Sequence, residues 1–174
     1  MFNLGNLVAY QLAWLAVILS AARGWAWIGA LVALIVAAAH VTLRREPREL
    51  RAIGLAVLIG LLVDSTLALT GQVRFASPWP AGLAPYWMLS LWAAFATTLN
   101  HSMHWLMTRP VGAALAGAAG GPLAYLAGAR LGALTLVTPA TTLAIISLLW
   151  TLAMVSLSMF VLRASTVPAE RSPA

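Results

Sequence analysis

The stretch at residues 95–105, FATTLNHSMHW, gathers an asparagine, two histidines and three hydroxyl side chains in an otherwise apolar sequence. On a helix, positions i, i+3, i+4 and i+7 share one face, and Thr97, Asn100, His101 and His104 have this spacing. A polar group without a partner is strongly unfavourable in hydrocarbon. The spacing therefore predicts a helix whose polar stripe faces the interior of a helical bundle.

The histidines allow three kinds of chemistry. They can form hydrogen bonds that hold helices together, with Gln11 or Asn100 as partners. His101 and His104, joined by His40, can instead offer three imidazoles in one layer to a metal ion or a haem, because histidine is the commonest metal ligand. Without a metal, the same imidazoles can bind a ligand or transfer protons. A spacing of i, i+3 does not separate these alternatives, so the cofactor stays open.

A second polar group contains Asp64, Ser65, Tyr125 and Arg130. Asp64 and Arg130 are the charges expected deepest in the membrane, and similar heights predict either an ion pair between the third and fifth spans or a functional site. In the functional alternative, Asp64 binds a lipid headgroup or moves a proton with Ser65 and Tyr125. Asp64 and His101 should differ by roughly 12 to 15 Å in depth, which disfavours one metal site that uses both.

The composition indicates what kind of element positions these side chains. The 174 residues are 62% hydrophobic and 8% charged, and the mean hydropathy is +0.92, which is typical of polytopic membrane proteins. The lack of cysteine and lysine excludes thiolate metal sites and a lysine-bearing phosphate loop. The net charge of +6 comes from arginines, four of them clustered at residues 43–51, so no nucleic-acid partner is expected.

Six stretches are long enough to cross roughly 30 Å of hydrocarbon as helices. They cover residues 4–22, 25–43, 50–70, 85–107, 111–133 and 139–162. We expect an all-α, multi-pass bundle of six transmembrane helices over residues 1–163 and a disordered cytoplasmic tail at 164–174. Both termini should be cytoplasmic, because seven arginines then lie on the cytoplasmic side and three outside.

The fifth span is expected to be the central packing helix. Gly117 with Gly121, and Gly128 with Gly132, have the spacing of small residues that lets helices approach closely. Pro122 lacks a backbone donor, so it should kink the helix and leave a carbonyl near residue 118 for another partner.

Four segments together resemble a bacterial inner-membrane family, domain of unknown function 2878. They are NLVAYQLAWLAV, LLVDS, WMLSLWAAFATTLNHSMHW and GGPLAYLAGARLGA. The residues that carry the resemblance are Gln11, Trp14, Asp64, Ser65, Trp92, Asn100, His101, Ser102, Trp105, Pro122, Tyr125 and Gly128. The resemblance implies a small multi-pass protein of the bacterial inner membrane with no established reaction. It also implies a genomic setting near fatty-acid-modifying methyltransferases and flavin oxidoreductases.

Three functions follow from these observations. The first is a non-catalytic component that binds a membrane lipid or a lipid-modifying enzyme, which fits the lack of a complete catalytic constellation. The second is an integral membrane enzyme that acts on a lipid through His101 and His104. The third is a small transporter that uses Asp64, Arg130 and the break at Pro122, although its two halves show no internal match.

Overall fold

The computed structural model describes residues 2–166, which form seven helices and two short strands. In chain order these are α1 (Phe2–Ala22), α2 (Ala26–Arg44), α3 (Pro47–Leu69), β1 (Val73–Phe75), α4 (Tyr86–Leu99), α5 (His104–Met107), α6 (Pro110–Arg130), β2 (Leu134–Leu136) and α7 (Pro139–Thr166). The expected all-α class is confirmed, with the two strands as a small addition.

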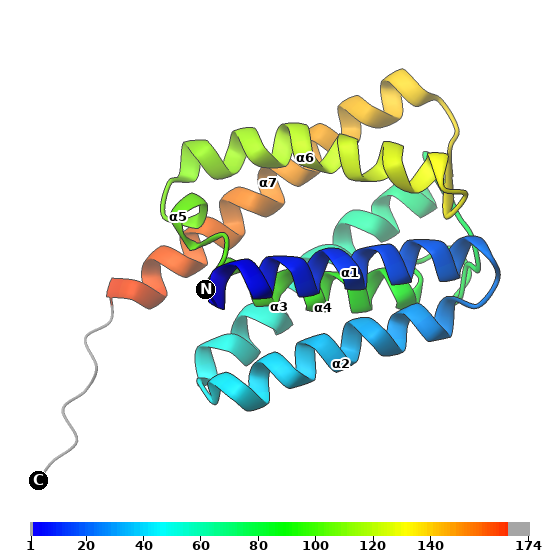
Figure 1. The fold of residues 1–174 in the computed structure, drawn as a ribbon. Helices are drawn as coiled ribbons and strands as arrows, with labels where there is room; N and C mark the ends of the chain where they lie inside the picture. Colours follow the sequence, from blue (N-terminus) through cyan, green and yellow to red (C-terminus); the bar gives the residue numbers. More distant parts are fainter. Residues whose placement is uncertain (1, 167–174) are drawn as a thin grey trace, which may run out of the picture.

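The helices form one bundle in which α1 begins and α7 ends at the same end (Figure 1). We call this the terminal end, and we call the opposite end, which carries β1 and β2, the strand end. Five helices, α1, α2, α3, α6 and α7, are long and apolar enough to span a membrane. Helix α4 has 14 residues and rises only about 21 Å, so it is too short to be the fourth of the six spans that the sequence predicts.

The expected fourth span, residues 85–107, is broken in two. Helix α4 ends at Leu99, a turn occupies residues 100–103, and α5 begins at His104. The side chains of Asn100 and Ser102 bond to residues of other helices, and such local polar side chains compete with a continuing helix. At the other boundary, α7 continues to Thr166, and the rest of the expected tail, residues 167–174, lies outside the described residues.

The central helix of the bundle is α4, and the expectation that the fifth span takes this place is wrong. Twelve of the 14 residues of α4 are buried, and the helix packs against α1, α2 and α3. The apolar side chains of Met88, Trp92 and Phe95 are buried as well as the polar ones. Helix α6 packs mainly against α7 at the edge of the bundle (Figure 1). Neighbours on every side of α4 thus override its amphipathic pattern.

Close packing of α6 on α7 confirms part of the glycine prediction. A Cβ atom on Gly117 would lie 2.4 Å from the Trp150 carbonyl oxygen, and one on Gly121 would lie 2.4 Å from the Trp150 ring. Pro122 lies inside α6, and the Ser147 hydroxyl donates a 2.9 Å hydrogen bond to the Ala118 carbonyl. This bond supplies the partner that the proline withholds.

The two strands repeat one motif in the two long hairpins α3–α4 and α6–α7. They pair antiparallel with Arg74 opposite Thr135, and each follows a glycine with positive φ, Gly71 at 67° and Gly132 at 85°. Only glycine adopts such angles readily, so each helix ends in the same kind of turn. The chain therefore carries a helix–strand–helix repeat, but it does not relate the first three spans to the last three.

Candidate functional site

Two buried carboxylates on α3 organise the polar side chains of the bundle. Glu49, in the first turn of α3, is 1% exposed, and Asp64, near the other end, is fully buried. Fifteen residues of helix separate them by about 22 Å. This distance divides the polar side chains around Asp64 and those around Glu49 into two separate sites. We call them the Glu49 centre and the Asp64 centre.

The Glu49 centre contains both histidines that the structure brings together. Nε2 of His40 lies 3.1 Å from Oε2 of Glu49, and Nε2 of His101 lies 3.2 Å from Oε1. The Asn100 amide donates a further hydrogen bond of 3.3 Å to Oε1. The ligating atoms of His40, Glu49 and His101 all lie within 4.8 Å of one another. These four residues define the Glu49 centre.

A short connection between α2 and α3 creates half of this centre. Helix α2 ends at Arg44, Arg45 adopts a left-handed conformation with φ of 54°, and Pro47 starts α3. Proline suits the first position of a helix, where no backbone donor is required. The reversal places His40, in the second-last turn of α2, beside Glu49, in the first turn of α3.

The turn at residues 100–103 supplies the other half of the centre. The Asn6 amide of α1 donates 3.2 Å to the Thr97 carbonyl, and its oxygen accepts 2.7 Å from the Ser102 hydroxyl. These bonds tie the turn to α1 and hold Asn100 and His101 toward Glu49. Burial lowers the pKa of His101 while the Glu49 carboxylate opposes this shift, so the neutral ring is favoured at pH 7.

The Asp64 centre has donors of a different type. The Trp92 indole donates 2.8 Å to Oδ2 of Asp64, and the Tyr125 hydroxyl donates to Oδ1. Asp64 therefore joins α3 to α4 and α6. The neighbouring Ser65 hydroxyl accepts 3.0 Å from the backbone amide of Ala84 and so fixes the loop before α4.

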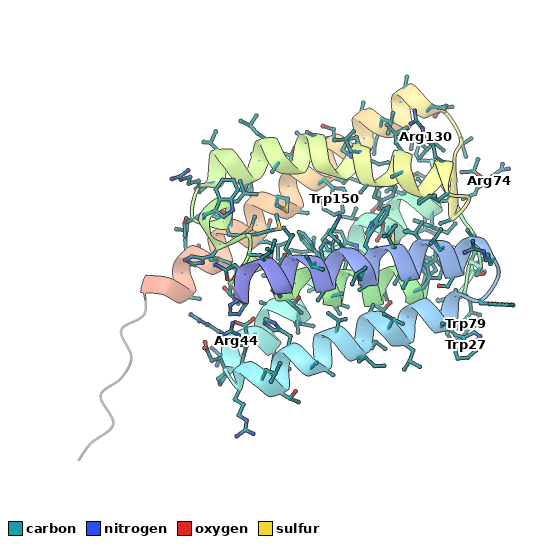
Figure 2. The ribbon with its side chains drawn as sticks, in the orientation of Figure 1. Trp27, Arg44, Arg74, Trp79, Arg130 and Trp150 are labelled. Atoms are coloured by element: carbon teal, nitrogen blue, oxygen red, sulfur yellow. The ribbon has the colours of Figure 1, made fainter. Side chains whose placement is uncertain are left out.

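Arg130 takes no part in the Asp64 centre. It is exposed at the end of α6 (Figure 2), and none of the ion pairs among the described residues joins it to Asp64. The predicted link between the third and fifth spans exists, but Tyr125 makes it in place of arginine. Burying an uncharged donor avoids the large desolvation penalty of a guanidinium.

An apolar groove opens between α1 and α6. Its volume is about 390 Å³, and it is lined by Leu7 and Gln11 of α1, Ala116 and Gly120 of α6, and Trp150 of α7. Figure 2 shows Trp150 between α6 and α1, inside the bundle. Leu7, Gln11 and Gly120 are exposed, so the groove faces sideways, toward the surroundings of the helices.

A smaller inner cavity adjoins this groove and leads to the Asp64 centre. The two share Tyr10, Phe95, Ala124 and Trp150 in their linings. Trp92 and Tyr125, the two residues that hold Asp64, also line the inner cavity. The Trp92 and Trp150 rings stack with centroids 4.7 Å apart, and Trp150 lines both the inner cavity and the groove.

Several predicted site residues lie away from both centres. His104 is exposed at the start of α5, outside the cluster of His40 and His101, so three imidazoles do not share one layer. Gln11 is exposed at the groove and is not a partner of His101 among the described contacts. The break after Leu99 turns His104 away from His101, because i, i+3 neighbours share a face only on a continuous helix.

The sequence interpretation missed Glu49, which it left between the expected spans at residues 25–43 and 50–70. A usable signal was present: Glu49 follows His40 by nine residues across a turn marked by Pro47, so both lie within reach of one another on consecutive antiparallel helices. The contribution of Asn6 had no comparable signal, because it depends on the contact of α1 with the turn after α4.

Comparison with known proteins bears on the whole arrangement. The family model DUF2878, described as a protein of unknown function, matches residues 3–156. No curated protein and no solved structure gives a match. The matched segment contains the Glu49 centre, the Asp64 centre and all residues named above as lining the groove. Because the family model covers most of the chain, this protein with its membrane-length helices belongs to the DUF2878 family, as its motifs predicted.

Proposed function

We propose that this protein is a non-catalytic lipid-binding component of the bacterial inner membrane, which holds one acyl chain in the groove between α1 and α6. The observation that carries the proposal is the combination of the groove's apolar lining and its sideways opening. Within a bilayer such an opening faces lipid tails instead of water, because the helices that border it have the length of membrane spans.

The height of the groove matches an acyl chain. Its lining residues on α6, from Ala116 to Ala124, lie about 9 to 21 Å along the helix from Pro110. This interval falls within roughly 30 Å of hydrocarbon, where tails lie and headgroups do not. Gln11 brings an amide to the lining, and because this residue is exposed, the amide can remain outside the chain-binding surface.

Small and aromatic residues give the groove its shape. Ala116 and Gly120 lower the wall of α6, and a Cβ atom on Gly120 would meet nothing within 4 Å. The Trp150 and Phe95 rings, 6.0 Å apart between centroids and inclined by 63°, provide an aromatic floor. Aromatic rings have few rotatable bonds, so such a floor contacts a flexible chain with little loss of its own conformational entropy.

We assign an accessory role because the resemblance implies a family whose genes lie near those of lipid-modifying enzymes. A chain held in a groove open to the bilayer can pass directly to an enzyme in the same membrane.

The terminal end faces the cytoplasm in this proposal. Support comes from the arginines: Arg44 lies near the terminal end, whereas Arg74 and Arg130 lie at the strand end (Figure 2). Arg45, Arg48, Arg51, Arg109 and Arg163 also border helix ends at the terminal end.

Photocrosslinking tests lipid binding. The protein is reconstituted in vesicles of phosphatidylethanolamine and phosphatidylglycerol that contain a phospholipid with a diazirine on its acyl chain. We expect crosslinks on the α1 and α6 walls of the groove. Ala116→Trp should reduce the crosslinked fraction several-fold because the indole fills the groove, whereas Ala119→Trp, on an exposed position of α6 outside the lining, should not.

Equal crosslinking of Ala116→Trp and Ala119→Trp, or labels spread evenly over all lipid-facing helices, would show that the groove holds no chain.

The orientation of the protein in the membrane is tested separately, since the absence of cysteine permits single-cysteine labelling. A membrane-impermeant maleimide should label Arg74→Cys in intact cells with the outer membrane permeabilised, and should label Arg109→Cys only after the inner membrane is opened.

A further inference from the structure

We propose that the Glu49 centre is a binding site for one divalent first-row transition metal, of the class of Zn²⁺ or Fe²⁺, with His40, Glu49 and His101 as ligands. Two imidazoles and one carboxylate form a ligand set that zinc enzymes and non-haem iron proteins both use. The proposal is independent of the groove between α1 and α6, because none of the three ligands lines that groove.

The separations of the ligand atoms fit a metal. Around a tetrahedral ion with bonds of 2.0–2.1 Å, neighbouring ligand atoms are about 3.3 Å apart. The Glu49 carboxylate oxygens lie 3.1 Å from Nε2 of His40 and 3.2 Å from Nε2 of His101. The two rings contact different oxygens of the carboxylate, and the three ligand atoms lie within 4.8 Å of one another, so they must close by up to about 1.5 Å to converge on one ion. The same ring nitrogen of each histidine, Nε2, points at the carboxylate.

Burial favours occupation by a cation. Glu49 is 1% exposed, and the side chains of His40 and His101 are 5% and 9% exposed. A carboxylate this deeply buried requires strong positive partners, because taking its charge out of water is expensive. A dication held by two neutral imidazoles supplies such a partner without ionising either ring.

The surrounding residues orient the ligands. The Asn100 amide donates 3.3 Å to Oε1 of Glu49, which is the role that hydrogen-bond donors play behind carboxylate ligands. The rings of His40 and His101 lie edge to face with centroids 4.8 Å apart, so each limits rotation of the other. Three protein ligands leave at least one coordination position for water or a substrate atom.

Arginines near the centre are compatible with this arrangement. Nε of Arg48 lies 3.6 Å from Oε1 of Glu49, but it also pairs with Glu46 at 2.5 Å, and its side chain is 46% exposed. Arg48 can therefore keep Glu46 as its partner when a dication takes its place beside Glu49. Arg44 adds positive charge near His101 and will weaken metal affinity without occupying a ligand position.

Metal analysis of the purified full-length protein in detergent tests the assignment. The protein is dialysed against Zn²⁺ in air and against Fe²⁺ without oxygen, and bound metal is measured by elemental mass spectrometry. We expect about one metal per chain for at least one of the two ions, at metal concentrations in the micromolar range. His101→Ala and Glu49→Gln should lose this binding, and Asn100→Ala should weaken it about tenfold.

His104→Ala is the matched control, because it removes the exposed neighbouring histidine that lies outside the cluster. It should retain full metal content. The melting temperature without added metal identifies variants that fail to fold, and X-ray absorption of the wild-type Zn²⁺ complex gives a second readout that needs no variant. It should show nitrogen and oxygen ligands at about 2.0–2.2 Å with a contribution from two imidazoles.

Two results would overturn the metal site: less than a tenth of an equivalent of either ion in the wild-type protein, or equal binding by wild type and by folded Glu49→Gln and His101→Ala. Such results would assign the cluster to hydrogen bonding between α2, α3 and the turn after α4. Lipid crosslinking of the same variants separates the two proposals, because loss of the metal should leave labelling of the groove unchanged.

Discussion

Glu49 and Asp64 lie on the same helix and are almost equally buried, yet their surroundings differ in kind. Two imidazoles and an amide surround Glu49 close to the terminal end of the bundle. Asp64 meets two aromatic donors from α4 and α6, deeper in the helix. Burial alone therefore does not determine what a carboxylate can do.

The two centres differ in the chemistry that the partners of each carboxylate allow. Imidazole nitrogens can release a proton and bind a metal, so the Glu49 centre has a chemistry beyond hydrogen bonding. The indole of Trp92 and the phenol of Tyr125 act as donors with large apolar bodies. The Asp64 centre is therefore best suited to joining three helices, with its aromatic partners forming the inner end of the cavity beside the groove.

The largest effect is expected for Asp64→Ala. This change leaves the Trp92 and Tyr125 donors buried without their acceptor, which should lower the free energy of unfolding by about 3 kcal/mol. Asp64→Asn keeps one acceptor oxygen and should lose roughly half as much. Reversible unfolding in mixed micelles, followed by tryptophan fluorescence, measures both. A loss below about 0.5 kcal/mol for Asp64→Ala would mean that Asp64 does not hold the helices together.

Gly60→Ala should have the next largest effect, because it disturbs the Asp64 centre without touching a polar group. A Cβ atom on Gly60 would lie 2.2 Å from Cδ1 of Trp92, which is 2% exposed and has little room to move. We expect a loss of about 2 kcal/mol in the same unfolding assay. Gly54→Ala is the control on the same helix, since its Cβ meets nothing within 4 Å and should leave stability unchanged or raised. Equal effects at Gly54 and Gly60 would refute the packing explanation.

The smallest effects should come from removing one donor at each carboxylate. Tyr125→Phe takes away one of the two side-chain donors of Asp64, and we expect a loss of about 1.5 kcal/mol. Asn100→Ala takes away one donor of Glu49, which keeps His40 and His101, and should cost about 0.5 kcal/mol without metal. Unfolding of both variants in parallel decides the order. The reverse order would show that the Glu49 centre is the more important of the two for stability.

The sequence predicted the spans well where one pattern dominated. Continuous apolar stretches of membrane length identified α1, α2, α3, α6 and α7 to within a few residues at most boundaries. The carbonyl near residue 118 was also predictable, because the missing donor of Pro122 is a local property of the chain. The prediction of the fourth span was wrong because no single local pattern dominates there. Its polar residues bond to other helices, and no local pattern shows where a helix gives way to such contacts.

The candidate site was predictable by residue type and not by grouping. His40 and His101 were among the candidate ligands, but the structure groups them with Glu49 and not with His104. Asp64 and Tyr125 were grouped correctly, whereas Arg130 lies outside their contact. Each error concerns which side chains meet across helices, and rotation of a helix about its axis decides this.

The sequence by itself determined that the chain forms helices of membrane length, where most of them begin and end, and to which family it belongs. These properties depend on local hydropathy, on proline and glycine, and on a family pattern that runs along the chain. Only the tertiary structure decided that α4 is the central helix, that Glu49 joins the two histidines, and that Asp64 pairs with aromatic donors. Packing selects one rotation and one neighbour for each helix from many of similar local energy, and this choice depends on the whole bundle at once.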